Sequence, residues 1–220
     1  MSLPAHPSLR VAILDLYQGA PNQGMRCIHQ ILNDWSEKEL VEVSVEVFDV
    51  RAKGELPGMD FDVFLSTGGP GDPLSSRYED WDIQWCRWLD RLIRHNLNPR
   101  TVDKKFAFFI CHSFQMACRH LNLGMVCKRH SPAFGVFPVN RLMGGMNEII
   151  FQGLGDPFYA VDSRDYQVIH PNEKRLLEMG GMTLCLEKER PHVPFERALM
   201  AARLKDRKST RLNSSHANIS

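Results

Sequence analysis

The chain has 220 residues, of which 43% are hydrophobic and 24% charged, a composition typical of a folded globular protein rather than a disordered or collagen-like one. Lys and Arg number 27 against 26 Asp and Glu, so no excess of charge indicates binding to nucleic acid or to an anionic membrane. No stretch approaches the ~20 consecutive apolar residues of a membrane-spanning helix, and residues 1–10 lack the apolar segment of a secretory signal. We therefore expect a cytoplasmic protein.

The N-terminal half of the chain alternates short apolar runs with amphipathic segments. Strands are expected at residues 11–14, 43–50, 63–66 and 106–110, the second of them at or near a sheet edge because its apolar residues alternate with polar ones. Helices are expected at residues 25–35 after an N-cap at Asn22, at 81–97 with its tryptophans in the core, and at 113–121. This alternation predicts an α/β fold with a parallel sheet covered on both faces.

The C-terminal half has a different pattern, with short alternating pieces separated by turns. Strands are expected at residues 135–139, 148–151, 158–161, 182–186 and 198–204, and a helix at 174–179. These pieces predict antiparallel additions to the same domain. The six cysteines form no C-x-x-C pair, so we expect reduced thiols, no metal and no cofactor.

Cys111 lies where one predicted strand ends and a helix begins. A cysteine at such a sharp turn has its thiol above the C-terminal edge of the sheet, as in nucleophile elbows. The adjacent helix N-terminus supplies backbone N–H groups and a positive dipole end, which favour the thiolate. Cys111 is therefore the candidate nucleophile, although its position alone also suits a buried core residue.

The segment Thr67-Gly68-Gly69-Pro70-Gly71-Asp72-Pro73 directly follows the strand predicted at residues 63–66, and its glycines and prolines require a loop. In open α/β sheets the ligand crevice lies beyond the carboxyl ends of the strands, so this loop and Cys111 are expected at one edge. Glycines there allow the backbone to approach a ligand and to present N–H groups to an oxyanion.

These two segments resemble motifs of the class I glutamine amidotransferase family, as in GMP-synthase-like amidotransferase domains. The nucleophile motif G-[ILV]-C-x-G-x-Q is similar to the segment from Phe109 to Gln115, with matches at the hydrophobic residue, at Cys111 and at Gln115. Phe109 and Ser113 replace the two glycines. The family's G-G-P-G-[DS]-P loop is matched in full. The resemblance covers about residues 11–204 and implies a three-layer, flavodoxin-like sheet.

The resemblance also implies roles for individual residues. Cys111 would attack the side-chain amide carbon of glutamine, forming a γ-glutamyl thioester and releasing ammonia. Gly69 and His112 would donate backbone N–H groups to the tetrahedral oxyanion, and Gln115 would help to hold the glutamine.

In the family, the base is the histidine of a late His-Pro-Glu motif, whose glutamate orients the imidazole. The nearest match here is His170-Pro171-Asn172-Glu173, in which the glutamate is displaced by one residue. We interpret this segment as a strand-exit turn in which Asn172 caps the next helix. A degenerate dyad of His170 and Glu173 is the alternative.

Residues 206–220 read DRKSTRLNSSHANIS, are polar and aperiodic, and resemble a translated sequencing adapter. We therefore expect residues 1–10 to be an N-terminal extension, residues 11–205 an amidotransferase-like domain incomplete at its C-terminus, and residues 206–220 a non-native disordered tail. The catalytic His and Glu would then be lost by truncation, and the chain as given would be inactive.

The resemblance implies glutamine as the substrate and an ammonia-accepting synthetase as a possible partner. No ATP-binding segment is visible in the chain, so an acceptor-activating module would lie in another polypeptide or in the missing C-terminus. No nucleic acid or membrane partner is expected. Two alternatives are a stand-alone γ-glutamyl hydrolase of the same fold and a non-catalytic regulatory or interaction domain. Phe109 and the missing dyad favour the second of these.

Overall fold

The computed structural model describes residues 7–189 and 196–204. Most of the predicted N-terminal extension and the whole predicted tail at residues 206–220 lie outside the described residues. Packing contacts divide the chain into two compact units, residues 1–117 and 118–220, with the boundary inside helix α3 (His112–Leu121).

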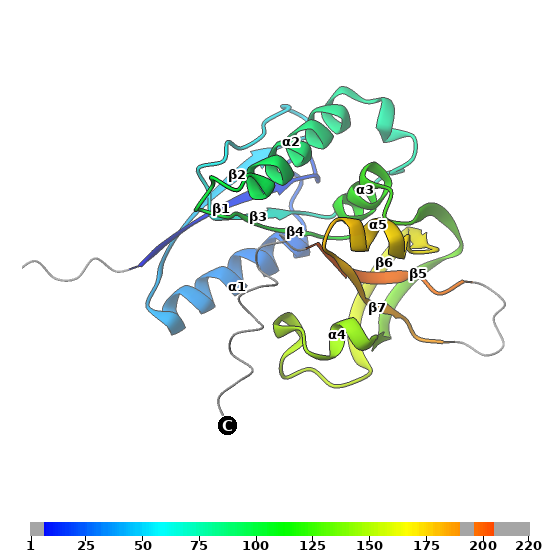
Figure 1. The fold of residues 1–220 in the computed structure, drawn as a ribbon. Helices are drawn as coiled ribbons and strands as arrows, with labels where there is room; N and C mark the ends of the chain where they lie inside the picture. The colour runs from blue at the N-terminus through cyan, green and yellow to red at the C-terminus, as the bar shows by residue number, and fades with distance from the viewer. Residues whose placement is uncertain (1–6, 190–195, 205–220) are drawn as a thin grey trace, which may run out of the picture. The chain divides into compact units, whose positions relative to one another are not determined.

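The first unit contains a parallel sheet in the order β2-β1-β3-β4 (Figure 1). Its strands are β1 (Ser8–Asp15), β2 (Glu42–Asp49), β3 (Val63–Ser66) and β4 (Phe106–Phe109). All four predicted strands are present, and β1 begins earlier than expected. β2 lies at the edge of the described sheet, as its alternating pattern predicted.

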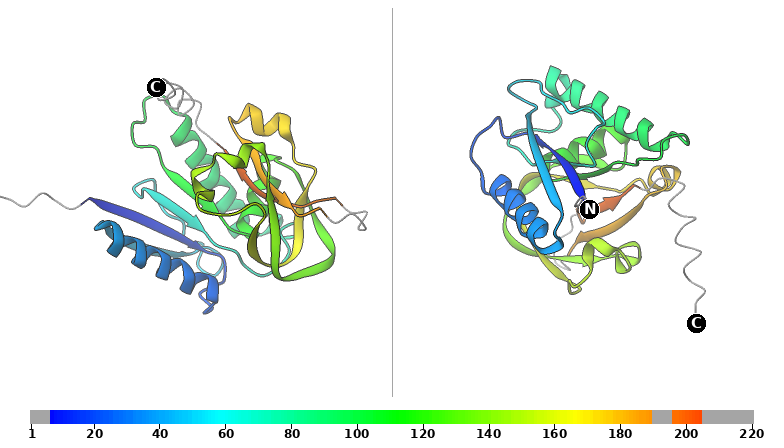
Figure 2. Two further views of the ribbon diagram at one scale, coloured as in Figure 1. Left: turned by 90° about the horizontal axis from the view of Figure 1, so that it is seen from below. Right: turned by 90° about the vertical axis from the view of Figure 1, so that its left-hand side faces the viewer.

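The helices α1 (Gln23–Glu39) and α2 (Asp80–Leu97) lie on opposite sides of this sheet (Figures 1 and 2). This follows from right-handed crossovers, because the chain moves from β1 towards one edge and from β3 towards the other. The predicted N-cap is confirmed, since the Asn22 side chain accepts a hydrogen bond from the N–H of Met25 at 2.9 Å. The unit therefore has the predicted three-layer α/β architecture.

The core of the first unit lies between β1, β3 and α2. Residues 11–14 of β1 are fully buried, and so are Trp85 and Trp88 of α2, as predicted for the tryptophans of this helix. The Trp88 ring meets Phe64 edge to face at a centroid distance of 5.3 Å. The indole N–H of Trp85 donates to the hydroxyl of Ser66 at 3.2 Å, which ties α2 to the end of β3.

The strand β4 differs from the fully buried strand that its apolar sequence predicted. Phe106 and Phe108 point to one face and are 71% and 47% exposed. β4 is the last described strand of its sheet, and α1 contacts β2 at the opposite end, so neither helix α1 nor a further described strand covers these side chains. An apolar run is therefore not sufficient to predict burial on both faces.

The second unit is built on an antiparallel sheet in the order β6-β5-β7-β8, which confirms the antiparallel C-terminal half. Its strands are β5 (Met125–Arg141), β6 (Phe158–Ile169), β7 (Met182–Glu187) and β8 (Leu199–Arg203). The helices α4 (Met143–Met146) and α5 (Glu173–Glu178) both contact β7. Asn172 caps α5 as predicted, accepting a hydrogen bond from the N–H of Arg175 at 3.1 Å.

The strand predicted at residues 148–151 is wrong, because this segment forms the 3₁₀ turn η2 (Ile149–Phe151). The N–H of Phe151 donates to the carbonyl of Glu148 at 3.0 Å, a local bond that replaces pairing with another strand. Phe151 is buried and stacks on Phe158 at 5.4 Å, so one side chain anchors the turn in the core of the unit.

Candidate functional site

Cys111 occupies the turn between β4 and α3, and its side chain is exposed. Its φ angle is +52°, a left-handed conformation that is uncommon for a residue other than glycine and that clusters at functional sites. The turn is held by the N–H of Ile110, which donates to the carbonyl of Ser66 at 3.0 Å, and by the N–H of Gln115, which donates to the carbonyl of Cys111 at 3.0 Å. This is the strand-turn-helix geometry of a nucleophile elbow.

The two residues that replace motif glycines are accommodated in this turn. The Phe109 ring packs edge to face against Trp85 at 5.7 Å, so it contributes to the core between β4 and α2. The Ser113 hydroxyl is fully buried, donates to the carbonyl of Ser66 at 2.7 Å and accepts from the N–H of Ile110 at 2.9 Å. Neither side chain prevents the turn from forming.

The glycine loop after β3 lies directly beside Cys111. A Cβ atom placed on Gly68 would lie 3.4 Å from the Cβ of Cys111 and 3.2 Å from the hydroxyl of Tyr17. A Cβ atom on Gly69 would lie only 2.6 Å from the carbonyl oxygen of Leu16, too close for any side chain. The loop therefore requires glycine at position 69 for its close approach to the neighbouring backbone, whereas a side chain at position 68 would need the Tyr17 hydroxyl to shift slightly.

Hydrogen bonds tie this loop to the segment that follows β1. The Thr67 hydroxyl accepts from the N–H of Leu16 at 2.9 Å and donates to the carbonyl of Gly68 at 2.8 Å. The Asp15 carboxylate accepts from the N–H groups of Tyr17 at 2.8 Å and of Gly19 at 2.9 Å, which holds the segment after β1 in place. Three strand ends, those of β1, β3 and β4, thus meet at the C-terminal edge of the parallel sheet, where open α/β sheets bind ligands.

The other predicted site residues lie on α3. His112 is its first residue, is 2% exposed, and has its ring 6.4 Å from that of Trp81. Gln115 follows in the first turn and is also buried. The structure thus brings Cys111, His112 and the Gly68-Gly69 loop to one edge, with Gln115 behind them in the helix.

Tyr17 is a site residue that the sequence analysis missed. Burial raises the pKa of its phenol, and the proximity of Cys111 and then of Asp15 raises it further. The hydroxyl group therefore stays protonated near the thiol and can donate a hydrogen bond. Its position just after β1, at the same sheet edge as the glycine loop, is the signal that could have identified it.

The histidine of the near-match motif lies in the second unit, where its partner is not the expected one. The His170 imidazole lies 3.3 Å from the carboxylate of Glu196. Glu173 instead accepts a hydrogen bond from the Thr183 hydroxyl at 2.6 Å. The alternative dyad of His170 and Glu173 is therefore not formed, and His170 stands at the strand exit with a φ of +47°.

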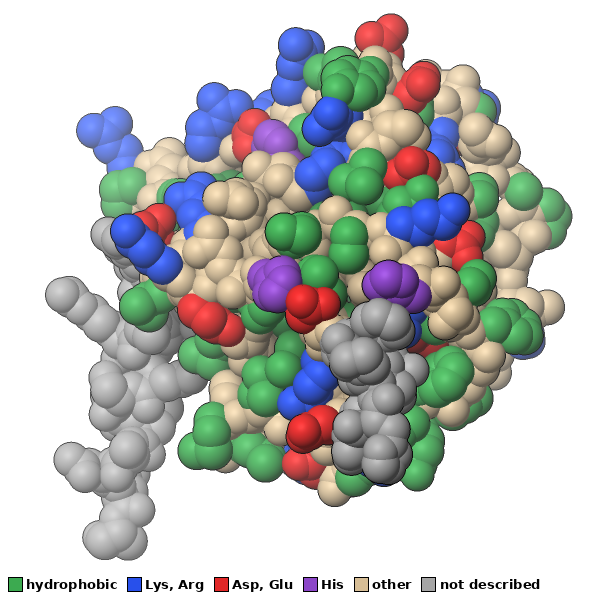
Figure 3. Space-filling model, turned by 90° about the vertical axis from the view of Figure 1, so that its right-hand side faces the viewer, with side chains coloured by type: hydrophobic (Ala, Val, Ile, Leu, Met, Phe, Trp, Pro, Cys, Tyr) green, Lys and Arg blue, Asp and Glu red, His purple; other side chains and the backbone are tan. Residues whose placement is uncertain are grey.

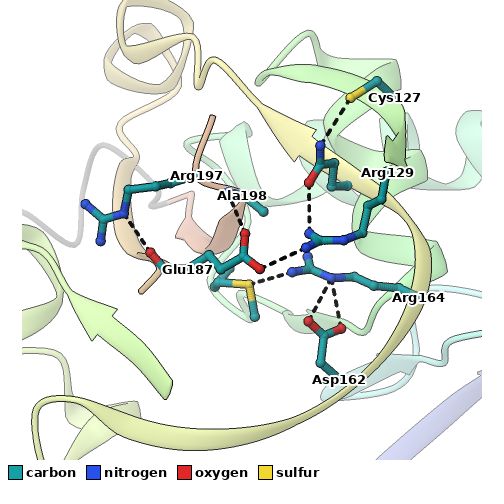
Figure 4. Close-up of polar contacts among 9 residues, drawn as sticks. Cys127, Arg129, Asp162, Arg164, Glu187, Arg197 and Ala198 are labelled. Atoms are coloured by element: carbon teal, nitrogen blue, oxygen red, sulfur yellow. Dashed lines mark hydrogen bonds and ion pairs between the residues drawn. The ribbon is translucent and has the colours of Figure 1, made fainter. Parts of the chain in front are cut away.

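A cluster of buried charges crosses the sheet of the second unit (Figure 4). The Arg129 guanidinium donates to Gln167 at 2.8 Å and to the Glu187 carboxylate at 2.9 Å. Arg164 is paired with Asp162 at 2.8 Å. Arg129 and Arg164 are each paired with a carboxylate, whereas Arg197 donates to the backbone carbonyl of Glu187 at 2.7 Å, and the bonds of Arg129 join strands β5, β6 and β7.

Three features of the described part of the chain bear on other functions. No group of three or more His, Cys, Asp or Glu side chains in residues 7–189 and 196–204 is arranged to hold a metal ion. On the face in Figure 3, basic and acidic side chains are interspersed with apolar ones rather than gathered by sign. None of the helices in the described ranges combines the length and hydropathy that crossing a membrane requires.

Comparison with solved structures identifies the fold. A glutamine amidotransferase from Thermotoga maritima aligns over 89% of this chain and 74% of its own, with a TM-score of 0.60 and 13% identity. The glutaminase domain of Trypanosoma brucei CTPS with bound acivicin aligns over 86% and 79%, with a TM-score of 0.60 and 13% identity. A glutamine amidotransferase from Methylobacillus flagellatus aligns over 91% and 67%, with a TM-score of 0.55 and 10% identity.

No protein-family model matches the sequence, and no curated protein matches it significantly. The structural likeness shows that the chain has the class I glutamine amidotransferase fold, as the two motifs predicted.

Proposed function

We propose that this chain is the glutamine-hydrolysing part of a class I glutamine amidotransferase, with Cys111 as its nucleophile. The observation that carries the proposal is the placement of Cys111, which is exposed at φ +52° between β4 and α3 and lies beside the glycine loop, where a Cβ atom on Gly68 would be 3.4 Å from its own. This geometry suits attack on a carbonyl group held at the C-terminal edge of a parallel sheet. The fold shared with solved glutamine amidotransferases supports the same reaction.

The proposed reaction uses the residues that meet at this edge. The Cys111 thiolate attacks the side-chain amide carbon of glutamine, and the oxyanion that develops accepts hydrogen bonds from the N–H groups of Gly69 and His112. The C–N bond then breaks, ammonia leaves with an added proton, and water hydrolyses the γ-glutamyl thioester to glutamate. Gln115 helps to hold the substrate.

The proton transfers need a base that we expect in a His-Pro-Glu motif beyond residue 205. His170 does not supply this motif, because its carboxylate partner is Glu196 rather than a glutamate two residues later. Loss of one member of a catalytic triad removes most of the rate. We therefore expect no measurable glutamine turnover from the 220-residue chain.

Covalent labelling by acivicin tests the proposal without requiring turnover. Acivicin is bound in the Trypanosoma brucei glutaminase domain, and its chlorine can be displaced by a thiolate. We expect it to modify Cys111 and not Cys27, although both thiols are exposed. L-Glutamine should slow this labelling, the Cys111→Ala variant should abolish it, and peptide mapping by mass spectrometry identifies the modified residue.

Two outcomes would contradict the proposal or change it. Equal labelling of Cys27 and Cys111 by acivicin, with no protection by glutamine, would indicate a merely exposed thiol. Ammonia release from glutamine by the 220-residue chain, abolished in Cys111→Ala, would show that the chain has its own base and would assign that role to His170.

An ammonia-accepting synthetase is the partner that this proposal implies. The glutaminase domain among the solved relatives is described as part of CTPS, a larger protein. A partner would be recognised by glutamine-dependent amination of its acceptor, which free ammonium should replace.

A further inference from the structure

Arg51 lies in the turn after β2 and connects two of the loops that form the candidate site. One nitrogen of its guanidinium, Nη1, donates to the carbonyl of Leu16 at 3.1 Å and to the carbonyl of Pro70 at 2.7 Å. A second nitrogen, Nη2, lies 3.2 Å from where a Cβ atom on Gly71 would be. The guanidinium thus spans the segment after β1 and the glycine loop after β3.

These contacts lie on both sides of Gly69. The Leu16 carbonyl is the group that leaves no space for a Cβ atom on Gly69, so Gly69 rests directly against it. Pro70 is the next residue, and its carbonyl accepts the shorter of the two hydrogen bonds from Arg51. Arg51 therefore holds both the residue that follows Gly69 and the carbonyl against which Gly69 packs.

Arg51 is also linked to the second proposed oxyanion donor. Its guanidinium carbon lies 4.4 Å from the centre of the Trp81 ring, and that ring lies 6.4 Å from the ring of His112. Stacking on an aromatic face suits the planar guanidinium group, which is weakly hydrated. Burial lowers the pKa of Arg51, with the carboxylates of Asp82 and Glu79 opposing the shift.

We propose that Arg51 is a positioning residue for oxyanion stabilisation: it aligns the Gly69 N–H through the carbonyls of Leu16 and Pro70, and supports His112 through Trp81. This inference rests on the proposed function. In this role Arg51 acts through the backbone of the loops and not through a contact with the substrate. It acts by holding backbone donors where negative charge develops, a role in which small displacements cause large losses of rate.

The test compares two reactions of the same thiol. The γ-4-nitrophenyl ester of glutamate acylates a thiolate through a tetrahedral oxyanion, and nitrophenolate leaves with its electron pair, so no acid is needed. Iodoacetamide alkylates the thiolate by displacement of iodide and forms no oxyanion. Acylation is followed by nitrophenolate release and by the mass of the Cys111 peptide, and alkylation by the mass of the same peptide.

In Arg51→Met we expect the acylation rate of Cys111 to fall by on the order of 10–100-fold, because a donor is misplaced rather than removed. Its alkylation rate should stay within about twofold of the unsubstituted chain. The acylation rate in Arg51→Lys should lie between that of Arg51→Met and that of the unsubstituted chain, because an ammonium can reach one or both carbonyls but does not stack as a flat group.

Arg10→Met is the matched control. Arg10 also donates to a backbone carbonyl, that of Asp60 at 3.0 Å, and also lies over an aromatic ring, that of Phe61 at 4.7 Å. It makes these contacts near the N-terminal end of the sheet. Both reactions of Cys111 should therefore be unchanged in Arg10→Met.

Unchanged acylation in Arg51→Met would overturn the inference, and so would an equal fall in acylation and alkylation, because that would indicate an altered thiolate or an altered exposure. If Arg51→Met fails to fold, the ratio of the two rates in Arg51→Lys decides the same question. A different result would contradict the proposed function itself: in the unsubstituted chain, the ester would acylate Cys111 no faster than the exposed Cys27. The inference about Arg51 would then fail as well.

Discussion

The hydroxyl group of Ser113 donates a hydrogen bond to the carbonyl oxygen of Ser66 at 2.7 Å, joining the start of α3 to the end of β3. Ser66 is the residue before the glycine loop begins at Thr67, and Ser113 lies two residues after Cys111. One side chain thus connects the loop and the nucleophile turn. A glycine, which the family motif has at this position, could not make this bond.

Replacing Ser113 tests how much this connection contributes. Ser113→Ala removes a buried hydroxyl and leaves the Ser66 carbonyl with one partner fewer, so we expect a loss of about 1–3 kcal/mol in the free energy of unfolding. Urea unfolding followed by tryptophan fluorescence measures this loss. Ser75→Ala is the control, because the Ser75 hydroxyl makes only a long, exposed bond to Asp72 at 3.4 Å and should change stability by less than ~0.5 kcal/mol. Equal effects of the two substitutions would contradict the prediction.

The cysteines provide a prediction about reactivity. Burial raises the pKa of Cys118 to about 12 and that of Cys185 to about 11. A raised pKa leaves less thiolate at any given pH, so both thiols should resist iodoacetamide at pH 8 and should remain slow up to about pH 9. Cys27 and Cys111 are exposed and should react.

Peptide mapping of the native chain after alkylation measures this difference, and the urea-unfolded chain provides the control in which all six cysteines react. Alkylation of Cys118 in the native chain as fast as that of Cys27 would show that its surroundings open more readily than the structure indicates.

Much of the fold follows from local patterns that the sequence displays. The strands β1, β3 and β4 contain apolar runs that end at polar or glycine-rich segments, β2 alternates apolar with polar residues, and the starts of α1 and α5 are marked by the caps Asn22 and Asn172. The full length of β5 and β6 was not predictable in this way. These strands contain charged residues such as Arg129, whose partners Gln167 and Glu187 are 38 and 58 residues distant in sequence.

The candidate site shows the same difference between features with a local sequence pattern and features that depend on distant contacts. Cys111 and the loop at Gly68 could be predicted because each directly follows an apolar strand, and parallel strands bring such positions to one edge. Arg51 could not, because its contacts with Leu16 and Pro70 span 35 and 19 residues and have no local pattern. The exposed face of β4 was also missed, because the apolar sequence of a strand does not show which other elements pack against it.

The close contact at Gly69 predicts that replacing this glycine by alanine lowers stability, whereas the same replacement at Gly155 does not. Gly69→Ala places a methyl group 2.6 Å from the backbone oxygen of Leu16, so the loop must move, at a cost of about 1–3 kcal/mol. Gly155→Ala is the matched control: its nearest neighbour, the carbonyl of Pro157, lies at 3.4 Å, an ordinary contact. There the loss of chain entropy in the unfolded state should make alanine neutral or stabilising by up to ~1 kcal/mol.

Thermal unfolding and acivicin labelling together check this pair. Gly69→Ala should lower both the melting temperature and the rate of labelling at Cys111, whereas Gly155→Ala should leave the labelling unchanged. A Gly69→Ala variant with the stability and labelling rate of the unsubstituted chain would contradict the loop geometry described above.

The buried ion pair in the second unit predicts a large effect on stability. The side chains of Arg129 and Glu187 are only 7% and 13% exposed. Arg129→Met removes the guanidinium that pairs with this buried carboxylate at 2.9 Å, so we expect a loss of about 3–5 kcal/mol in the free energy of unfolding. Arg26→Met, on the exposed face of α1, should change stability by less than ~0.5 kcal/mol.

The double variant Arg129→Met/Glu187→Gln separates charge from packing. If the cost of Arg129→Met comes from an uncompensated buried charge, then removing that charge as well should recover a large part of the lost stability, because an amide is cheaper to bury than a carboxylate. Urea unfolding of the unsubstituted chain, Arg129→Met, Glu187→Gln and the double variant measures the coupling between the two residues. A double variant no more stable than Arg129→Met would show that the arginine contributes through packing and through its bond to Gln167 instead.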